Sequence, residues 1–269
     1  MINLSNNFSL VSIEGLDNTT FLQGQLTIDL NNMQNNEIRF SAHCNALGKV
    51  ESFFILGKKD DKYFSIIENS LTEHFIKCLK KYAIFSKINF SNILEKSIKI
   101  DIDFSKLDII FDNTEINFKF LTKLNSNNKS VKNLLSYQDL FINYGIALFD
   151  ISHINKFIPQ NLNLDSLGNC ISFEKGCYIG QETIARAKYR GANKYCMKIF
   201  KVNNQNINQN IKAKPISFLI GESTRNTGEI LNYIQKDNIL YLQAIINNKY
   251  ENKDFSILIQ EKSLPLEKL

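Results

Sequence analysis

The stretch ISFEKGCYIGQETIARAKYRGANK, residues 171–194, places a cysteine between two glycines and continues with a run of helix-forming residues. Glycine is favoured where φ must be positive or where another group approaches the backbone closely. Residues 181–190 favour a helix, and Gly191 is placed to end it. We therefore expect Cys177 to lie in a turn just ahead of a helix N-terminus.

This position predicts chemistry for the thiol of Cys177. Unpaired N–H groups and the helix macrodipole stabilise an anion at a helix N-terminus, and Lys175 is two residues away. Both effects favour the thiolate, which is the reactive form of cysteine. Cys177 and Lys175 are thus the candidate catalytic residues. The alternative is that Cys177 is a small buried apolar residue and that the glycines only form a tight turn.

The other cysteines do not indicate a cage for a metal or cluster. The chain has 5 cysteines and 3 histidines, without a C-x-x-C pair and without histidine spacing typical of metal ligands. An odd cysteine count without such pairs fits a reducing cytoplasm. We expect the remaining cysteines to lie in apolar or strand-like surroundings: Cys44, Cys78, Cys170 and Cys196.

Length and composition predict a globular protein of two or three domains. The 269 residues are 43% hydrophobic and 22% charged, with a formal net charge of +5. This mild positive excess permits an anionic partner but does not require one. The N-terminus does not resemble a signal peptide, and no apolar run approaches the ~20 residues that span a bilayer. We expect a soluble, cytoplasmic protein without a membrane partner.

The chain divides at two polar stretches, residues 125–129 and 203–210, that lack apolar periodicity. The first part predicts an α+β arrangement, with a helix beginning at residues 17–22, a capping box at residues 70–73 and a helix whose buried face carries Phe75, Leu79 and Tyr82. Strands are expected in this part at residues 8–13, 38–43, 49–56 and 63–67. The last part contains only strand patterns, typical of a small antiparallel barrel or sandwich, at residues 196–202, 216–220, 229–234, 239–245 and 255–259.

The octet KGCYIGQE, residues 175–182, resembles the K-G-C-Y-x-G-Q-E signature of the YgfZ proteins, folate-binding relatives of the glycine-cleavage T-protein. The resemblance extends in order along the chain, from near the N-terminus to Lys194. The further similar segments are FLQGQLT (21–27), AHCNALGK (42–49), KYAIFSK (81–87), FIPQ (157–160) and ARAKYRGANK (185–194).

The resemblance implies a multi-domain fold like that of the T-protein. Its parts would be a discontinuous first domain (1–40 and 133–194), a ferredoxin-like α+β domain (41–132) and an antiparallel β-barrel (195–269). A central cavity would bind tetrahydrofolate, with the cysteine loop near it. Members of this family help to maintain iron–sulfur enzymes, notably those that thiolate tRNA, and the thiol of Cys177 would carry that activity.

Folate presents a flat pterin, an aminobenzoate ring and carboxylates, so aromatic faces and a few basic groups suit it. The family is similar in using aromatic residues on two strands, typically tryptophans. This chain has no tryptophan. The corresponding positions hold Phe8 and Tyr137. Their rings have less area and a weaker π face than tryptophan, which predicts a lower affinity for folate. Packing in the core is the alternative role of these two rings. Within and after the signature, the expected folate contacts are Tyr178, Gln181, Glu182, Arg186 and Arg190.

Arg186 and Arg190 are four residues apart, so a helix places them on one face. That face could meet the glutamate tail of folate, a phosphate backbone or an acidic partner protein, or serve only solubility. The segment has no interleaved aromatic platform for stacking single-stranded bases. An effect on tRNA is therefore expected to pass through another enzyme.

Three functions remain open from the sequence. The first is a folate-binding, non-enzymatic accessory factor that uses Cys177 to assist assembly or repair of iron–sulfur client enzymes, such as tRNA thiotransferases. The second is a tetrahydrofolate-dependent aminomethyltransferase of the T-protein type, against which the cysteine signature argues because T-proteins do not carry this loop. The third is an RNA-binding module.

Overall fold

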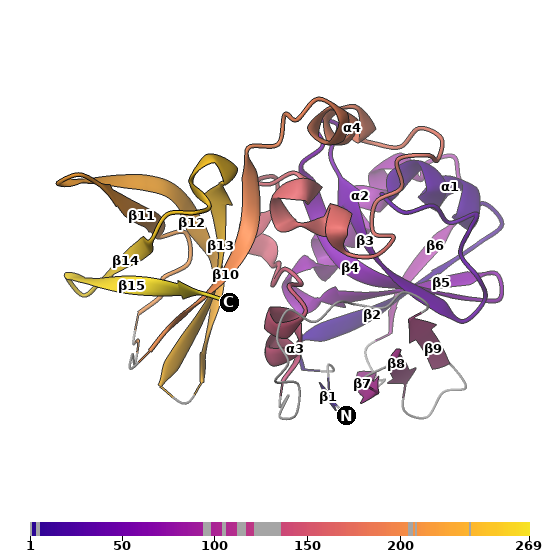
Figure 1. Cartoon of the computed structure of the whole chain (residues 1–269). Helices are drawn as coiled ribbons and strands as arrows, with labels where there is room; N and C mark the ends of the chain where they lie inside the picture. The colour runs from indigo at the N-terminus through magenta and orange to yellow at the C-terminus, as the bar shows by residue number, and fades with distance from the viewer. Residues whose placement is uncertain are drawn as a thin grey trace.

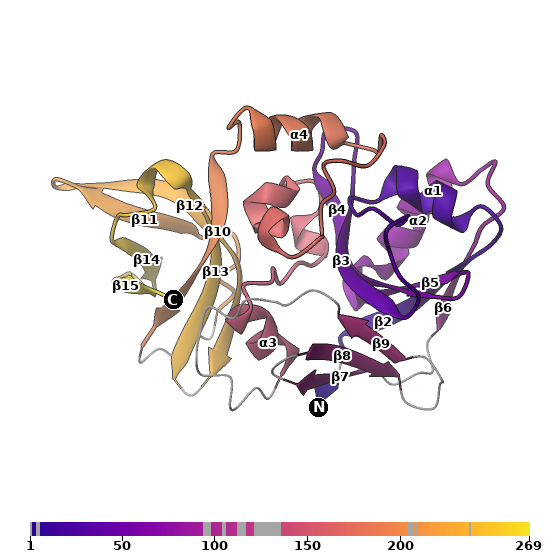
Figure 2. The ribbon, with the colours of Figure 1, turned by 45° about the vertical axis from the view of Figure 1, so that its right-hand side comes forward.

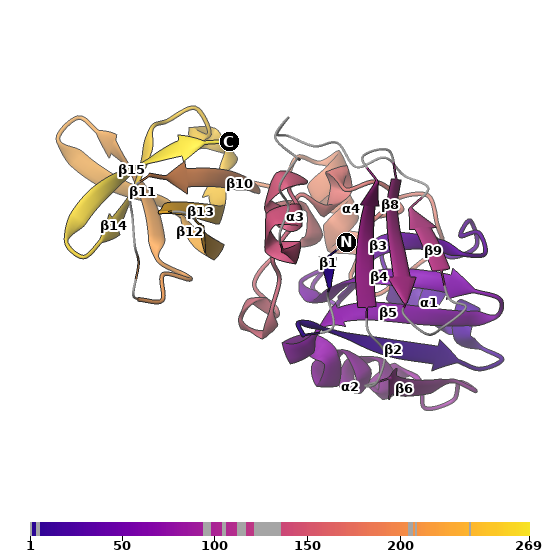
Figure 3. The ribbon, with the colours of Figure 1, turned by 90° about the horizontal axis from the view of Figure 1, so that it is seen from below.

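The computed structural model describes residues 2–3, 6–93, 98–103, 106–111, 117–120, 136–203, 207, 209–236 and 238–269. Within these residues the chain builds a large β-sheet with helices packed around it and a separate barrel beside it (Figure 1). Seen from below, the barrel lies to one side of the sheet (Figure 3). The α+β class predicted from the sequence is confirmed.

Nine strands of the described chain form one ferredoxin-like sheet. Every neighbouring pair is antiparallel except β9 and β3. In spatial order the strands are β1 (Ile2–Asn3), β7 (Ile98–Asp103), β8 (Lys106–Phe111), β9 (Asn117–Phe120), β3 (Glu37–Cys44), β4 (Val50–Lys59), β5 (Lys62–Glu68), β2 (Phe8–Glu14) and β6 (Asn89–Ile93).

The helices are short. The α-helices are α1 (Asn18–Gln25), α2 (Thr72–Tyr82), α3 (Tyr137–Asn143) and α4 (Gln181–Tyr189). Single 3₁₀ turns are η1 (Asn69–Leu71), η3 (Ile151–His153), η4 (Pro159–Leu162), η5 (Leu164–Ser166) and η6 (Asn248–Tyr250). Across the described residues, none of these helices has the length and apolar character needed to cross a lipid bilayer.

The barrel predicted at the C-terminal end is confirmed and is closed. Its strands pair in the order β10 (Tyr195–Val202), β13 (Ile239–Asn247), β12 (Ser223–Lys236), β11 (Pro215–Ile220), β14 (Phe255–Ile259) and β15 (Lys262–Lys268). The sequence pattern did not predict β15, because its run KSLPLEK has few apolar residues and contains a proline. This strand closes the barrel by pairing with both β14 and β10. Closure leaves no free sheet edge among the described strands of the barrel.

Segments far apart in the sequence lie side by side beneath α4. The hydroxyl of Thr27 donates to the carbonyl of Cys170 at 2.7 Å, and Ser172 N donates to the carbonyl of Thr27 at 2.8 Å. Ile179 N donates to the carbonyl of Gly24 at 3.1 Å. The chain after residue 136 therefore returns to the N-terminal segment, as a discontinuous first domain would require.

The division into three domains itself stays a prediction. The barrel begins at Tyr195, where the last boundary was placed. The boundary between residues 40 and 41 falls inside β3. The boundary at 132/133 and the polar stretch 125–129 lie outside the described residues, and the polar stretch 203–210 is described only in part.

The start of α2 differs from the predicted capping box. Ser70 lies one turn earlier, in η1, where the carboxylate of Glu68 accepts from Ser70 N at 2.9 Å and also from its hydroxyl. Leu71 is the N-cap of α2 and makes no side-chain cap. The nearby carboxylate thus engages the serine before the helix begins. The predicted buried face holds for Phe75 and Leu79, whereas the last helical residue, Tyr82, is 43% exposed.

The barrel is attached to the sheet part through the side chain of Gln243 on β13. Its oxygen accepts from Leu148 N at 2.7 Å, and its nitrogen donates to the carbonyl of Ile146 at 2.7 Å. Asn232 on β12 donates to the carbonyl of Leu148 at 2.9 Å. Because Gln243 is fully buried, these bonds satisfy an amide that has no access to water.

The turn between β3 and β4 touches the start of α4 through two glycines. Gly180, the N-cap of α4, has φ +82°, and Gly48 has φ +72°. A Cβ added at Gly180 would lie 2.5 Å from the carbonyl oxygen of Asn45 and 2.8 Å from Gly48 Cα. This contact holds the cysteine loop against the sheet.

We expect Gly180→Ala to lower the free energy of unfolding by more than Gly191→Ala does. Gly191 also has positive φ, +60°, but open space surrounds the position of an added Cβ. Gly191→Ala should thus cost only the conformational term, about 1–2 kcal/mol. Gly180→Ala adds the overlap with backbone atoms, a further 1–3 kcal/mol or so. Urea unfolding of both variants measures the difference, and equal losses would contradict the tight contact.

Candidate functional site

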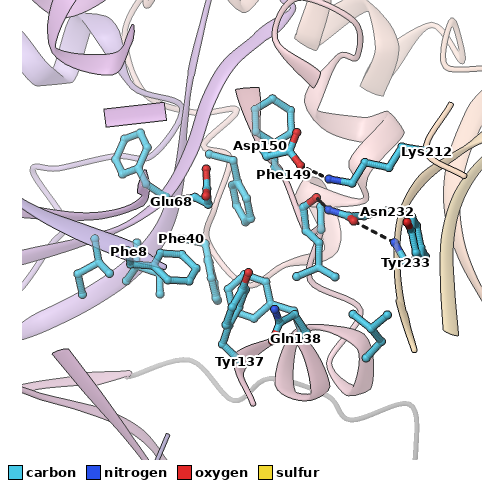
Figure 4. A pocket seen from close by; sticks show the side chains of 18 residues that line it. Phe8, Phe40, Glu68, Tyr137, Gln138, Phe149, Asp150, Lys212, Asn232 and Tyr233 are labelled. Carbon is cyan, nitrogen blue, oxygen red and sulfur yellow. Dashed lines mark hydrogen bonds and ion pairs between the residues drawn. The ribbon is translucent and has the colours of Figure 1, made fainter. Parts of the chain in front are cut away.

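A cavity of about 420 Å³ lies where the sheet, α3 and the barrel meet (Figure 4). Its floor is aromatic and aliphatic, and polar groups reach it from both sides. The lining residues are Phe8, Phe40, Phe53, Phe54, Ile55, Ile66, Glu68, Tyr137, Gln138, Phe141, Ala147, Leu148, Phe149, Asp150, Lys212, Asn232, Tyr233 and Ile234. Apolar walls with a few polar groups are typical of small-molecule pockets.

Phe8 and Tyr137, the two rings expected to contact folate, meet in this cavity. Their centroids are 5.0 Å apart at an interplanar angle of 89°, an edge-to-face contact. Tyr137 makes a second such contact with Phe141 at 5.7 Å. Burial raises the pKa of Tyr137, and the charges of Glu68 and Asp150 act in the same direction. The hydroxyl is therefore a neutral donor, and it points into the cavity (Figure 4).

The expectation that Tyr137 lies on a strand is wrong, because it is the first residue of α3. The hydroxyl of Ser136 accepts from Asp139 N at 3.1 Å, and the carboxylate of Asp139 accepts from Ser136 N at 3.2 Å. This capping box fixes the start of the helix and the direction of the Tyr137 side chain. The S-x-x-D spacing in the sequence is the signal that would have predicted it.

The polar groups of the cavity were not found from the sequence. Glu68 ends β5, Asp150 precedes η3, and Asn232 belongs to the barrel, so no local motif connects them. The carboxylate of Asp150 forms an ion pair with Lys212 and accepts from Ser152 N at 2.9 Å. Burial acts to raise the pKa of Asp150, but the hydrogen bonds from Lys212 and Ser152 outweigh it and lower the pKa. Asp150 is therefore ionised at neutral pH.

His153 supports this side of the cavity as a neutral ring. Burial lowers its pKa. Its Nδ1 accepts from Asp150 N at 3.0 Å, so its Nε2 donates to the carbonyl of Leu231 on β12 at 2.8 Å. The ring thus links the start of η3 to the barrel.

The loop that contains Cys177 lies elsewhere, beside α4. Cys177 is exposed, as a reactive thiol requires and a core cysteine would not be. In the views of Figures 1 and 2, α4 lies at the edge of the molecule opposite α3. None of the pocket-lining residues belongs to the cysteine loop or to α4. The residues that line the aromatic cavity and the thiol of Cys177 are therefore not brought together.

The ammonium of Lys175, which was expected to assist the thiol of Cys177, is bound by backbone carbonyls. It donates to the carbonyls of Leu26 and Ile28, each at 2.7 Å, and lies 4.9 Å from the centre of the Tyr178 ring. The side chain is buried, with 8% of its surface exposed. Lys175 thus links the cysteine loop to the N-terminal segment through these two hydrogen bonds. The catalytic role expected of Lys175 stays a prediction.

The other residues expected to bind folate surround α4. Tyr178 is 7% exposed, and its hydroxyl has no hydrogen-bond partner among the described residues. Gln181 accepts from Tyr178 N at 3.4 Å. Arg186 forms an ion pair with Glu182 on the exposed face of the helix, and Arg190 is exposed. These residues lie in α4 or beside it, and none of them lines the cavity that contains Phe8 and Tyr137.

Of the other cysteines expected in the core, Cys44 and Cys170 are buried, whereas Cys78 and Cys196 are partly exposed. Burial raises the pKa of each of the two buried thiols above its usual range. Both are therefore neutral and unreactive at neutral pH.

The chain is similar to an uncharacterized protein of Haemophilus influenzae. The two sequences are 34% identical over 278 residues, which cover 96% of this chain and 95% of that protein. The chain belongs to the family of that protein. No model of a known protein family matches the sequence.

The fold is that of the glycine-cleavage aminomethyltransferase. The crystal structure of glycine cleavage system aminomethyltransferase T from Bartonella henselae superposes with a TM-score of 0.61 over 99% of this chain and 84% of that one. The sequence identity is 10%, so the likeness concerns the fold alone. It confirms the T-protein-like architecture inferred from the sequence.

The buried ammonium of Lys175 predicts a pH dependence of stability. Burial lowers its pKa from 10.5 to about 8, an effect that the charge of Asp29 only partly opposes. Between these two values the unfolded chain binds more protons than the folded one, so the contribution to stability rises with pH, by about 1.4 kcal/mol per pKa unit. Tyrosines and cysteines titrate in the same range. The measurement is therefore the difference in unfolding free energy between the wild type and Lys175→Met across this window. A difference that does not change with pH would contradict the burial of a charged amine.

Proposed function

We propose that this chain is a folate-binding accessory factor. In this proposal the cavity holds a reduced folate, and Cys177 serves iron–sulfur client enzymes, including those that thiolate tRNA, at a separate surface. The observation that carries the folate assignment is the meeting of Phe8 and Tyr137 with the carboxylate of Glu68 in one pocket. The T-protein fold and the K-G-C-Y-x-G-Q-E octet support it.

The chemistry of the pocket suits a pterin. The flat ring would pack against Phe8, Phe40 and Tyr137, whose faces and edges attract a polarised aromatic system. The edge of a pterin presents neighbouring N–H donors, and a carboxylate such as Glu68 can accept two of them. A volume of about 420 Å³ is within the range of small-molecule sites.

The placement of Cys177 supports a role toward another protein. An exposed thiol on a loop beside α4 can be reached by a macromolecule, whereas a thiol inside the pocket could act only on the bound folate. Folate and client would then bind on different sides of the same body. Lys175 and Gly180 hold the loop in place, so the thiol is presented on a fixed support.

An aminomethyltransferase is the second candidate, and the carboxylates in the pocket favour it. Glu68 and the ionised Asp150 face the space where a one-carbon unit on folate would react. Folate-dependent release of ammonia from an aminomethyl-lipoyl carrier protein would be the measurement. Turnover in this assay that is lost in Asp150→Asn would replace the accessory function with this enzymatic one.

Tetrahydrofolate should bind to the purified protein and raise its melting temperature. Glu68→Gln keeps the packing and the acceptor for Ser70 N but removes the charge, so we expect the affinity to fall by about 10- to 100-fold. Tyr137→Ala should also weaken binding. Tyr189→Ala is the matched control, because this ring is 69% exposed on α4 and outside the pocket. If neither tetrahydrofolate nor its polyglutamates shifts the melting transition of the wild type, the cavity assignment is wrong.

Cys177→Ser should abolish the rescue of thiolated-tRNA levels in a strain that lacks this protein. The variant should keep its circular dichroism spectrum and its folate affinity, because the side chain is exposed and outside the pocket. Cys196→Ser, a half-buried cysteine of the barrel, is the control and should rescue. Full rescue by Cys177→Ser would remove the thiol from the mechanism while leaving the folate assignment intact.

A further inference from the structure

Three side chains with metal-ligating atoms meet between β4 and α2. The ligating atoms of Glu51, His74 and Cys78 all lie within 4.8 Å of one another. Cys78 Sγ is 3.3 Å from His74 Nε2 and 3.8 Å from Glu51 Oε2. His74 Nε2 and Glu51 Oε2 are also within hydrogen-bond distance of each other. Each residue is partly exposed, so an ion can reach the cluster from solvent.

The helix supplies two of these ligands by its period. His74 and Cys78 are one turn apart and therefore lie on the same face of α2. Their neighbours Phe75 and Leu79 are fully buried, and Phe75 packs against Phe54 of β4 with centroids 4.7 Å apart. This apolar contact fixes the rotation of the helix, so that the imidazole and the thiol lie beside β4.

An irregularity in β4 supplies the third ligand. Cys44 pairs with Val50, whereas the preceding residue, His43, pairs with Ser52, so Glu51 has no partner on β3. This arrangement is a β-bulge, which turns side chains away from the regular alternation of the strand. The bulge lets Glu51 reach His74 and Cys78 on α2, and bulges of this kind are frequent beside functional sites.

His43 adds an independent observation near the cluster. It is 2% exposed, and neither ring nitrogen has a hydrogen-bond partner among the described residues. A buried polar group without a partner is uncommon and calls for an explanation, of which an ion or water bound nearby is one.

We propose that Glu51, His74 and Cys78 form a binding site for a divalent transition-metal ion, with Zn²⁺ as the preferred ion. Sulfur, nitrogen and oxygen ligands of these types bind Zn²⁺ in proteins, and a thiolate disfavours Mg²⁺ and Ca²⁺. On binding, the S–H bond of Cys78 is replaced by a sulfur–metal bond and the proton leaves to solvent. Thiolate and carboxylate then neutralise the two charges of the ion, and three protein ligands leave a fourth position for water.

Cobalt titration of the full-length, metal-free protein tests this site. Co²⁺ should bind with one ion per chain and show the intense visible bands of a four-coordinate ion together with a thiolate-to-cobalt charge-transfer band. Zn²⁺ should displace it. Cys78→Ser should lose the charge-transfer band. Loss of a residue that only orients a metal ligand lowers metal affinity roughly 10- to 100-fold. Because His74 and Glu51 would bind the ion directly, His74→Ala and Glu51→Gln should each lower the affinity for Co²⁺ by more than this.

Two cysteine variants control for other thiols. Cys196→Ser is matched to Cys78→Ser, because both residues are half-buried, and it should leave the cobalt spectrum unchanged. Loss of the band in Cys177→Ser instead of Cys78→Ser would assign the ion to the exposed thiol and overturn the proposal. Absence of any thiolate band in the wild type, with folding confirmed by circular dichroism, would also overturn it. Neither result bears on folate binding.

Discussion

The candidate pocket depends on the buried amide of Gln243. This side chain joins the barrel to residues 146–148 through two hydrogen bonds of 2.7 Å, and it has no exposed surface. An amide left unpaired in the interior would cost about 1–3 kcal/mol, so the barrel and the segment before η3 are bound to one arrangement. Asn232 and His153 repeat the connection beside it. One wall of the cavity therefore comes from the barrel and the other from the sheet.

The fold also separates the aromatic pocket from the thiol of Cys177. The aromatic pocket is formed by the sheet, α3 and the barrel, whereas the exposed Cys177 lies beside α4 on another side of the body. Lys175 ties the cysteine loop to the N-terminal segment, because its ammonium donates to the carbonyls of Leu26 and Ile28. A long flexible side chain goes where it finds partners, and distance along the sequence does not decide its direction.

Some parts of the site could be predicted and others could not. Phe8 follows from a strand pattern. Tyr137 follows from the family resemblance, but it begins a helix capped by Ser136 and does not lie on a strand. The ion pair of Asp150 and Lys212 left no local signal, since the two residues belong to different parts of the fold. The cluster of Glu51, His74 and Cys78 could be predicted only in part. The spacing of His74 and Cys78 is visible in the sequence, but the approach of Glu51 requires the bulge in β4.

Short sequence patterns are enough to predict the local elements: strand alternation in the sheet, the all-strand character of the barrel, and the glycines that turn the chain ahead of α4. These follow from side-chain period and backbone freedom, which act over a few residues. Which side chains share a cavity, where the Lys175 ammonium points and whether Cys177 lies near the aromatic pocket follow from the packing of the whole chain. Those outcomes depend on which buried polar groups find partners across the fold, and such partners are separated by most of the chain, as Thr27 is from Cys170.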